Sequence, residues 1–207
     1  MLNSSSPFTP EELRLIADRD FFLAKARIMK KVRGLLEELH GVLQGELRDV
    51  DLLTPPGFDP AKCQFVKGEH LEEYPYQYLD FPKHFQGDEK FTFRSLFWWG
   101  HHFVFALILE GHLLLRYKQN MINRYHQVAG RGLELALAPS PWNWHAGEGY
   151  TMSLAHDRKS QVSAVLSGRP FFKVVRVIPH DDPVVGEGRL VDVGRETLRA
   201  VLPIITP

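Results

Sequence analysis

Cysteine is nearly absent from this chain of 207 residues, since Cys63 is the only one. A single cysteine cannot form a disulfide within the chain, and disulfides are typical of oxidising compartments. The first twelve residues, MLNSSSPFTPEE, contain neither a basic segment nor the apolar run of a secretory signal. We therefore expect a cytoplasmic protein, with residues 1–8 as a disordered lead.

An excess of charge of one sign is also lacking, because 25 lysines and arginines balance 25 aspartates and glutamates. The summed charge offers no general attraction to nucleic acid or to anionic membranes, so neither is expected as a partner. The one candidate for a membrane span, residues 95–115, alternates with period two and contains three histidines. A lipid-facing helix does not need that pattern, so we expect no membrane-spanning segment.

Motifs that would define a reaction are missing as well. The chain has no H-E-x-x-H or G-x-S-x-G, and its three G-x-G pairs do not continue into a nucleotide-binding motif. Cys63 lies in AKCQF, which has no feature of an activated thiol. The ten histidines do not assemble into a known metal-ligand spacing. The sequence therefore assigns no catalytic residue, no metal and no cofactor, and leaves open whether the protein is an enzyme.

Against these absences, the sequence has ample apolar residues for an ordered core, at 44% hydrophobic and 24% charged. The most informative segment is Phe91 to Leu109, whose odd positions are almost all aromatic or aliphatic. Such alternation is typical of a strand with one buried face. A single strand of that length would measure roughly 63 Å, far beyond the usual range. We therefore expect Gly100 to reverse the chain and form an antiparallel hairpin.

Two helices are predicted before the sheet. Thr9 and Glu12 form a capping box for a short helix over 10–17. A longer helix begins near Asp20, and its glycines predict an end near Gly41. The apolar stripe of this helix can be buried against the sheet, or it can pair with its copy in a second chain to make a homodimer. The stripe consists of Phe21, Ile28, Val32, Leu35, Leu39 and Leu43.

The pattern as a whole predicts a single α+β domain over residues 1–207, with a mainly antiparallel sheet and helices packed on it. The strand over 74–81 is placed at a sheet edge, because Pro75 and Pro82 cannot donate to a ladder. The predicted parts are N-terminal helices (9–48), a sheet with inserted helices (63–178) and a C-terminal helix and tail (190–207), with strands over 64–67, 74–81, 91–98, 102–109, 132–138 and 170–178 and helices over 112–128, 157–167 and 195–202.

A second unusual segment, PSPWNWHAGEGY over 139–150, places two tryptophans in a loop rich in proline and glycine. These tryptophans either anchor the loop on the core or form the wall of a ligand site. If the loop folds over the hairpin tip, aromatic and histidine side chains converge in a small-molecule pocket. Arg94 supplies an anion partner there, or stacks on a tryptophan for structure. The predicted ligand-binding residues are Arg94, Trp98, Trp99, His101, Trp142, Trp144, His145 and Tyr150.

Two functions follow from these patterns. The first is a small-molecule binding protein or enzyme that uses the pocket lined by tryptophan and histidine. The alternative is a non-catalytic interaction module that dimerises through the long N-terminal helix.

Overall fold

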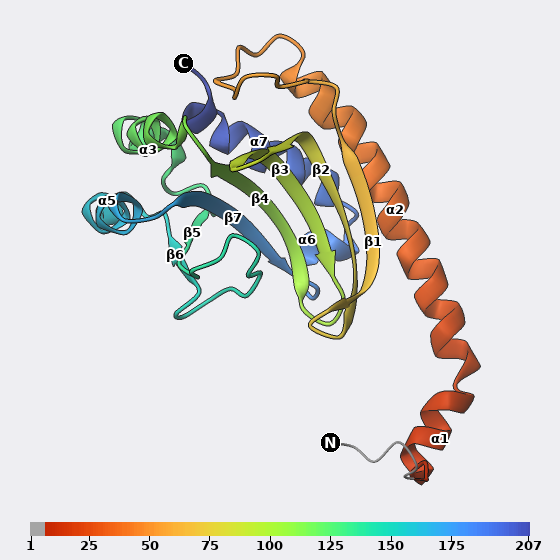
Figure 1. Ribbon diagram of the computed structural model, residues 1–207. Coiled ribbons are helices and arrows are strands. Elements are labelled where there is room, and N and C mark those ends of the chain that lie inside the picture. Colours follow the sequence, from red (N-terminus) through yellow and green to blue (C-terminus); the bar gives the residue numbers. More distant parts are fainter. Residues whose placement is uncertain (1–6) are drawn as a thin grey trace.

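The computed structural model describes residues 7–207, and within them it has seven α-helices and a seven-stranded antiparallel sheet (Figure 1). This confirms the predicted α+β class. The strands follow the order β1-β2-β3-β4-β7-β5-β6 across the sheet. Their bounds are β1 (Gln64–Leu71), β2 (Tyr74–Gln86), β3 (Glu89–Trp98), β4 (His102–Glu110), β5 (Glu134–Ala136), β6 (Thr151–Ser153) and β7 (Phe171–Pro179).

The predicted hairpin is confirmed as β3 and β4. Trp98 pairs with His102 at its tip, and Gly100 occupies the turn with φ of +75°, a conformation that glycine adopts without strain. The odd residues of both strands pack in the main core, beneath the helices. We call this side the helix face. The even residues form the other side, the open face, where Leu96, Trp98 and Val104 belong to a second and smaller apolar cluster.

The prediction that the strand around Tyr74 lies at an edge is wrong, because β2 pairs with β1 on one side and β3 on the other. Its prolines are tolerated for local reasons. Pro82 lies where the register with β3 shifts between Asp80 and Lys83, a bulge that leaves an unpaired position. Pro75 precedes Tyr76, the first residue of β2 to pair with β3.

The two N-terminal helices form as predicted at their starts. Helix α1 (Pro10–Ala17) has both hydrogen bonds of the capping box between Thr9 and Glu12. Helix α2 (Arg19–Leu47) continues past Gly41, however, so the predicted end is wrong. Leu39 and Leu43 are fully buried there, and their burial outweighs a glycine cost of about 1 kcal/mol per position.

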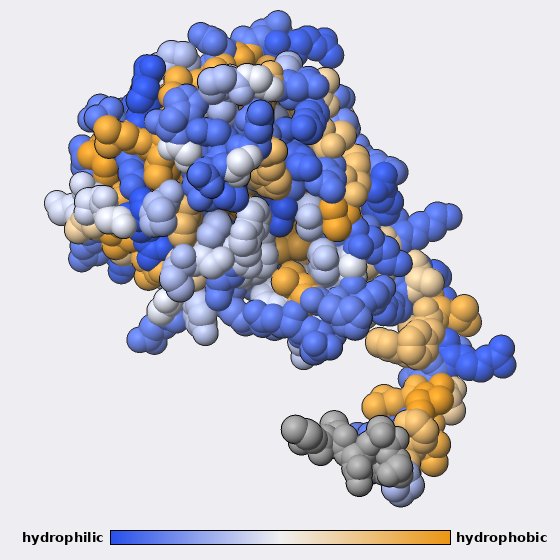
Figure 2. Space-filling model, viewed as in Figure 1, coloured by the Kyte–Doolittle hydropathy of each residue, from blue (hydrophilic) through white to orange (hydrophobic). Residues whose placement is uncertain are grey.

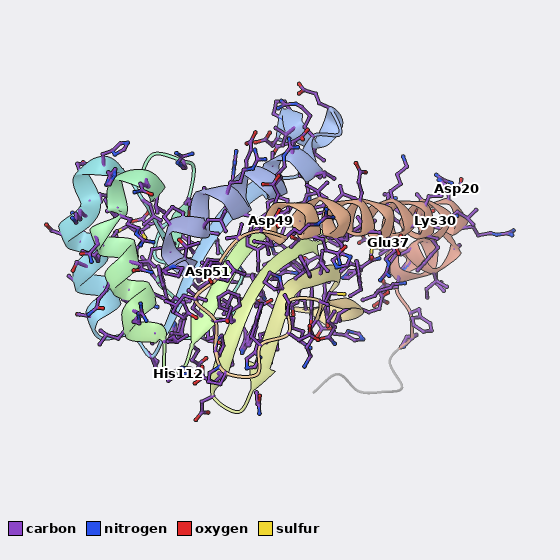
Figure 3. The ribbon with its side chains drawn as sticks, turned by 90° about the horizontal axis from the view of Figure 1, so that it is seen from above. Asp20, Lys30, Glu37, Asp49, Asp51 and His112 are labelled. Carbon is purple, nitrogen blue, oxygen red and sulfur yellow. The ribbon has the colours of Figure 1, made fainter. Side chains whose placement is uncertain are left out.

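Helix α7 (Leu190–Ile205) packs beside α2 on the helix face, as Figure 3 shows from above. The two helices approach closely at Gly194, where an added Cβ would lie 2.8 Å from a methyl carbon of Leu39. The helix predicted over 112–128 divides near Arg124 into α3 (Leu114–Asn123) and α4 (Tyr125–Val128). The remaining helices are the 3₁₀ turn η1 (His156–Arg158), α5 (Lys159–Ser167) and α6 (Pro183–Gly186).

The two ends of the predicted apolar stripe of α2 differ in their burial. Val32, Leu39 and Leu43 are buried within the same chain, so this part is not free to pair with a second copy. Phe21 and Ile28 are exposed, because α1 and the first turns of α2 project beyond the sheet (Figure 1). Figure 2 shows apolar surface along this projection.

Candidate ligand-binding site

The alternation of β3 places Arg94, Leu96 and Trp98 on the open face of the sheet. Neighbouring strands contribute side chains at matching positions, because residues directly opposite each other in a ladder share a face. Tyr78 pairs with Leu96, and Asp80 pairs with Arg94. The open face therefore carries a buried charged pair in an apolar and aromatic surface.

Asp80 and Arg94 form a bidentate ion pair. The guanidinium donates through Nε and Nη2 to the two carboxylate oxygens, both at 2.7 Å. Asp80 is completely buried and Arg94 is 6% exposed. The guanidinium carbon lies 3.7 Å from the centre of the Tyr78 ring, a cation–π distance. The pair is thus held in a single orientation by hydrogen bonds and by stacking.

The loop between β5 and β6 lies against this face. Trp144 is 5% exposed and packs in the open-face apolar cluster. The backbone on each side of it is fixed from below: Nζ of Lys173 donates to the carbonyl of Asn143 at 2.5 Å, and Nε2 of His102 lies 2.9 Å from the carbonyl of Trp144. Trp144 therefore anchors the loop, which is the structural role considered for it.

Trp142 is placed differently, since it is 39% exposed and stands above the charged pair. Its ring centre is 5.1 Å from the guanidinium of Arg94 and 6.0 Å from the ring of Phe85. Between Trp142 and the sheet lies an open hollow of about 420 Å³, a size that suits a small molecule. The hollow is lined by Gln64, Leu71, Tyr76, Tyr78, Phe85, Arg94, Leu96, Trp142 and Trp144.

Two tyrosines form an ordered wall of this hollow. Tyr76 and Tyr78 are two positions apart on β2 and so point to the same face. Their rings are nearly parallel, with an interplanar angle of 11° and centres 6.1 Å apart. Burial raises the pKa of the Tyr78 hydroxyl, against the opposing effect of Arg94, so this group stays neutral and able to donate. The hollow thus offers flat aromatic walls and polar groups at few points.

Lys173 lies beneath the loop and is 2% exposed. Its ammonium nitrogen is 3.7 Å from the centre of the Trp144 ring. Burial, with a smaller contribution from Arg94, lowers the pKa of this lysine to about 7. The amine is therefore only partly protonated near neutral pH, unlike an exposed lysine.

A second group of side chains gathers at the hairpin tip. The His101 ring stacks on Trp98 with centres 3.6 Å apart, and His145 lies 5.2 Å from Trp98. Nε2 of His145 also lies 2.9 Å from a carboxylate oxygen of Glu72. Burial, and next the charge of His145, lower the pKa of His101. Among residues 7–207, no group of three histidine, cysteine or acidic side chains is placed to hold a metal ion.

The predicted site residues are therefore divided among three places. Arg94, Trp142 and Trp144 line the hollow. Trp98, His101, His145 and Tyr150 gather at the hairpin tip, where Tyr150 lies 5.0 Å from His145. Trp99 joins neither group, because it points to the helix face and contacts Phe97 and Phe21.

Sequence reasoning missed the contribution of β2 and β7 to the site. The alternation of tyrosines at positions 74, 76 and 78 was a detectable signal, because it marks one face of a strand. A lysine within the apolar run FFKVVRV was another, since a charged residue in a buried strand requires a partner. The pairing of Asp80 with Arg94 had no local signal, because it depends on the register of two strands.

Comparisons with known protein families, with curated proteins and with solved structures found no match to this chain. In the part of the chain that the structure covers, residues 7–207, no helix is both long and apolar enough to cross a lipid bilayer.

Proposed function

We propose that this protein binds a small, flat and largely apolar molecule in the open-face hollow, as a binding protein or as an enzyme whose substrate occupies it. One observation supports this above all. A guanidinium, fixed by a buried carboxylate, lies at the base of a hollow whose walls are tyrosine, phenylalanine and tryptophan rings. Apolar walls with a few oriented polar groups are typical of small-molecule sites.

The charges at the base of the hollow narrow the class of ligand. Asp80 neutralises Arg94 and uses its Nε and Nη2 donors, and Lys173 is only partly protonated near neutral pH. The attraction for a multiply charged anion is therefore weak. A neutral ring system with a carbonyl or hydroxyl acceptor fits better, because Nη1 of Arg94 and the tyrosine hydroxyls can donate to it.

Exchange of Trp142 for alanine tests the proposal. A library of flat aromatic compounds is first screened for molecules that raise the melting temperature, and the dissociation constants of the hits are measured by calorimetry. W142A is expected to weaken binding at least tenfold, because it removes one wall of the hollow while the anchor Trp144 remains. Y76A is expected to act in the same direction.

The matched control is L115A, which removes an exposed apolar side chain from α3, away from the hollow. This variant is expected to bind the hits as the unaltered chain does. Hits that W142A and Y76A do not weaken would contradict the proposal, and hits that L115A alone weakens would bind instead in the hollow that Leu115 lines.

A second function, association with another protein chain, is favoured by the exposed apolar residues of the projecting helices. The internally buried part of the α2 stripe cannot provide this interface, so association would use the segment before Met29. We also propose a reducing, cytoplasmic location, which is supported by the single free cysteine, Cys63.

A further inference from the structure

The projecting N-terminal helices expose an unusual amount of apolar surface. We call residues 8–28, which comprise α1 and the first turns of α2, the N-terminal arm. Helix α1 has no buried residue. Eight large apolar side chains of the arm are between 40% and 66% exposed: Phe8, Leu13, Leu15, Ile16, Phe21, Phe22, Leu23 and Ile28. The arm thus presents apolar groups on more than one side, as helices do when they are enclosed.

The exposed area is large enough for a stable interface. With large apolar side chains of about 200 Å² each, these residues present on the order of 800 Å². Monomers rarely expose apolar patches above a few hundred Å². Complete burial of this surface on two arms would remove on the order of 1,600 Å² from water, which is the standard size of a specific protein–protein interface.

A groove with both apolar and basic lining residues lies beside the base of the arm. It opens where α2 leaves the sheet, and it has a volume of about 500 Å³. Phe22, Ala26, Met29 and Val66 supply apolar surface in it. Its charged lining residues are all basic, namely Lys25, Lys30, Arg33 and Lys67. We call this feature the basic groove.

The arm as a whole has four acids and four bases, but its outer part, residues 10–24, and the basic groove have net charges of opposite sign. Glu69 pairs with Lys25 and Lys67, and Glu37 pairs with Arg33, so four positive charges meet two negative ones and leave a local charge of +2. Residues 10–24 of the arm hold four acids and two bases, which gives −2. The acids are Glu11, Glu12, Asp18 and Asp20, and the bases are Arg14 and Arg19.

We propose that the occupant of the basic groove is the arm of a second copy of this chain, in a two-fold symmetric dimer. In such a dimer each copy contacts the other through the same pair of surfaces. If the two arms cross antiparallel near Phe22, counting back from the crossing brings α1 toward residues 27–34 of its partner, with the direction of α1 set by the non-helical Asp18 that separates it from α2. Met29, Lys30 and Arg33 of the groove lie in that range.

This inference rests on the proposed association function and assigns its partner. A lipid surface is the competing partner for an exposed amphipathic helix. Anionic membranes attract basic segments, whereas residues 10–24 carry a net negative charge. Residues 10–24 therefore have no electrostatic attraction to an anionic membrane, whereas they are attracted to the basic groove.

Sedimentation equilibrium of the full chain over a range of concentrations tests the proposal. The unaltered chain is expected to show a monomer–dimer equilibrium, and L13E/I16E is expected to weaken it at least tenfold. The control is L115E, which introduces one such charge at a similarly exposed apolar site on α3 and is expected to leave the dimer intact. Circular dichroism confirms that each variant is folded.

A charge exchange tests the groove itself. Glu11 of one arm lies opposite Arg33 of the partner's groove in this arrangement, so R33E and E11K are each expected to weaken the dimer. The double variant R33E/E11K is expected to restore it, because the arm of one copy then carries the new positive charge and the groove of the other carries the new negative charge. In a C63S background, chains with L13C and chains with K30C are expected to form a disulfide when mixed, and much less of one when either is alone.

The possible results distinguish docking of the arm in the basic groove from association of the chains in general. A dimer that is insensitive to L13E/I16E, or that forms no L13C–K30C cross-link, overturns docking in the groove while association stands. A chain that is monomeric at every concentration overturns the dimer. If that monomer also binds phosphatidylcholine vesicles, and L13E/I16E abolishes this binding, the arm is a lipid-binding element. If it binds no vesicles either, the association function fails as well.

Discussion

The buried pair of Asp80 and Arg94 connects the stability of the sheet with the chemistry of the hollow. Two charges that are almost entirely removed from water are tolerated when each is the partner of the other. The aromatic ring of Tyr78 covers the guanidinium at 3.7 Å and excludes water from one side of it. The orientation of Arg94 toward a ligand therefore depends on a carboxylate that the ligand does not touch.

Removal of the Asp80 carboxylate alone is expected to lower the free energy of unfolding more than removal of both charges does. D80A leaves a buried guanidinium unpaired and is expected to lower the free energy of unfolding by about 3–5 kcal/mol. The double variant D80L/R94M replaces the pair with apolar groups of similar size and is expected to lose much less. Urea unfolding of the three proteins measures this, and equal losses in both variants would show that the pair is not desolvated.

Lys173 predicts a specific dependence of stability on pH. Its pKa falls from 10.5 in an exposed chain to about 7 in the fold, so the unfolded chain binds more protons between these values. The contribution of Lys173 to the free energy of unfolding is fully present above pH 10.5 and is lost as the pH falls to about 7. The free energy of unfolding is therefore expected to rise from pH 7 toward pH 10, and this component is expected to disappear in K173M. An identical slope in both proteins would contradict the buried amine.

At the scale of elements, tertiary packing outweighed the local conformational preferences of glycine and proline wherever the two disagreed. The glycines of α2 predict an early end, but Leu39 and Leu43 find partners in the core and carry the helix to Leu47. The prolines around β2 predict an edge strand, but a bulge accepts one of them. The hairpin of β3 and β4 was predictable because its alternation, length and central glycine all agree.

Replacement of glycine by alanine is expected to have opposite effects on stability in the two packed helices, α2 and α7. Nothing lies within 4 Å of an added Cβ at Gly45, so G45A is expected to stabilise the protein by up to about 1 kcal/mol. At Gly194 the same atom would lie 2.8 Å from Leu39 and 2.9 Å from Phe105, so G194A is expected to destabilise it by about 1–3 kcal/mol. Thermal unfolding distinguishes the two, and stabilisation by both would show that α7 can move away from α2.

At the scale of the whole molecule, the sheet separates two environments. Its helix face holds the main core, and its open face holds the hollow with Arg94 and Trp142. The sequence analysis named Arg94, Trp142 and Trp144, three of the residues that line the hollow, because tryptophan in a polar loop and alternation in a strand are local signals. It did not predict how the candidate site residues divide between the hollow and the hairpin tip, since that depends on which distant strand the loop packs against.

The alternation of β3 also limits how this protein can diverge. Phe93 and Leu96 serve the two sides of the sheet from one ladder, so the gain or loss of a single residue in the strand would send core rings toward solvent and Arg94 into the interior. New binding preferences must therefore arise by replacement of side chains at constant length. Insertions are more easily tolerated in loops such as the segment that carries Trp142, and a change of length there would reshape the hollow without shifting the strand.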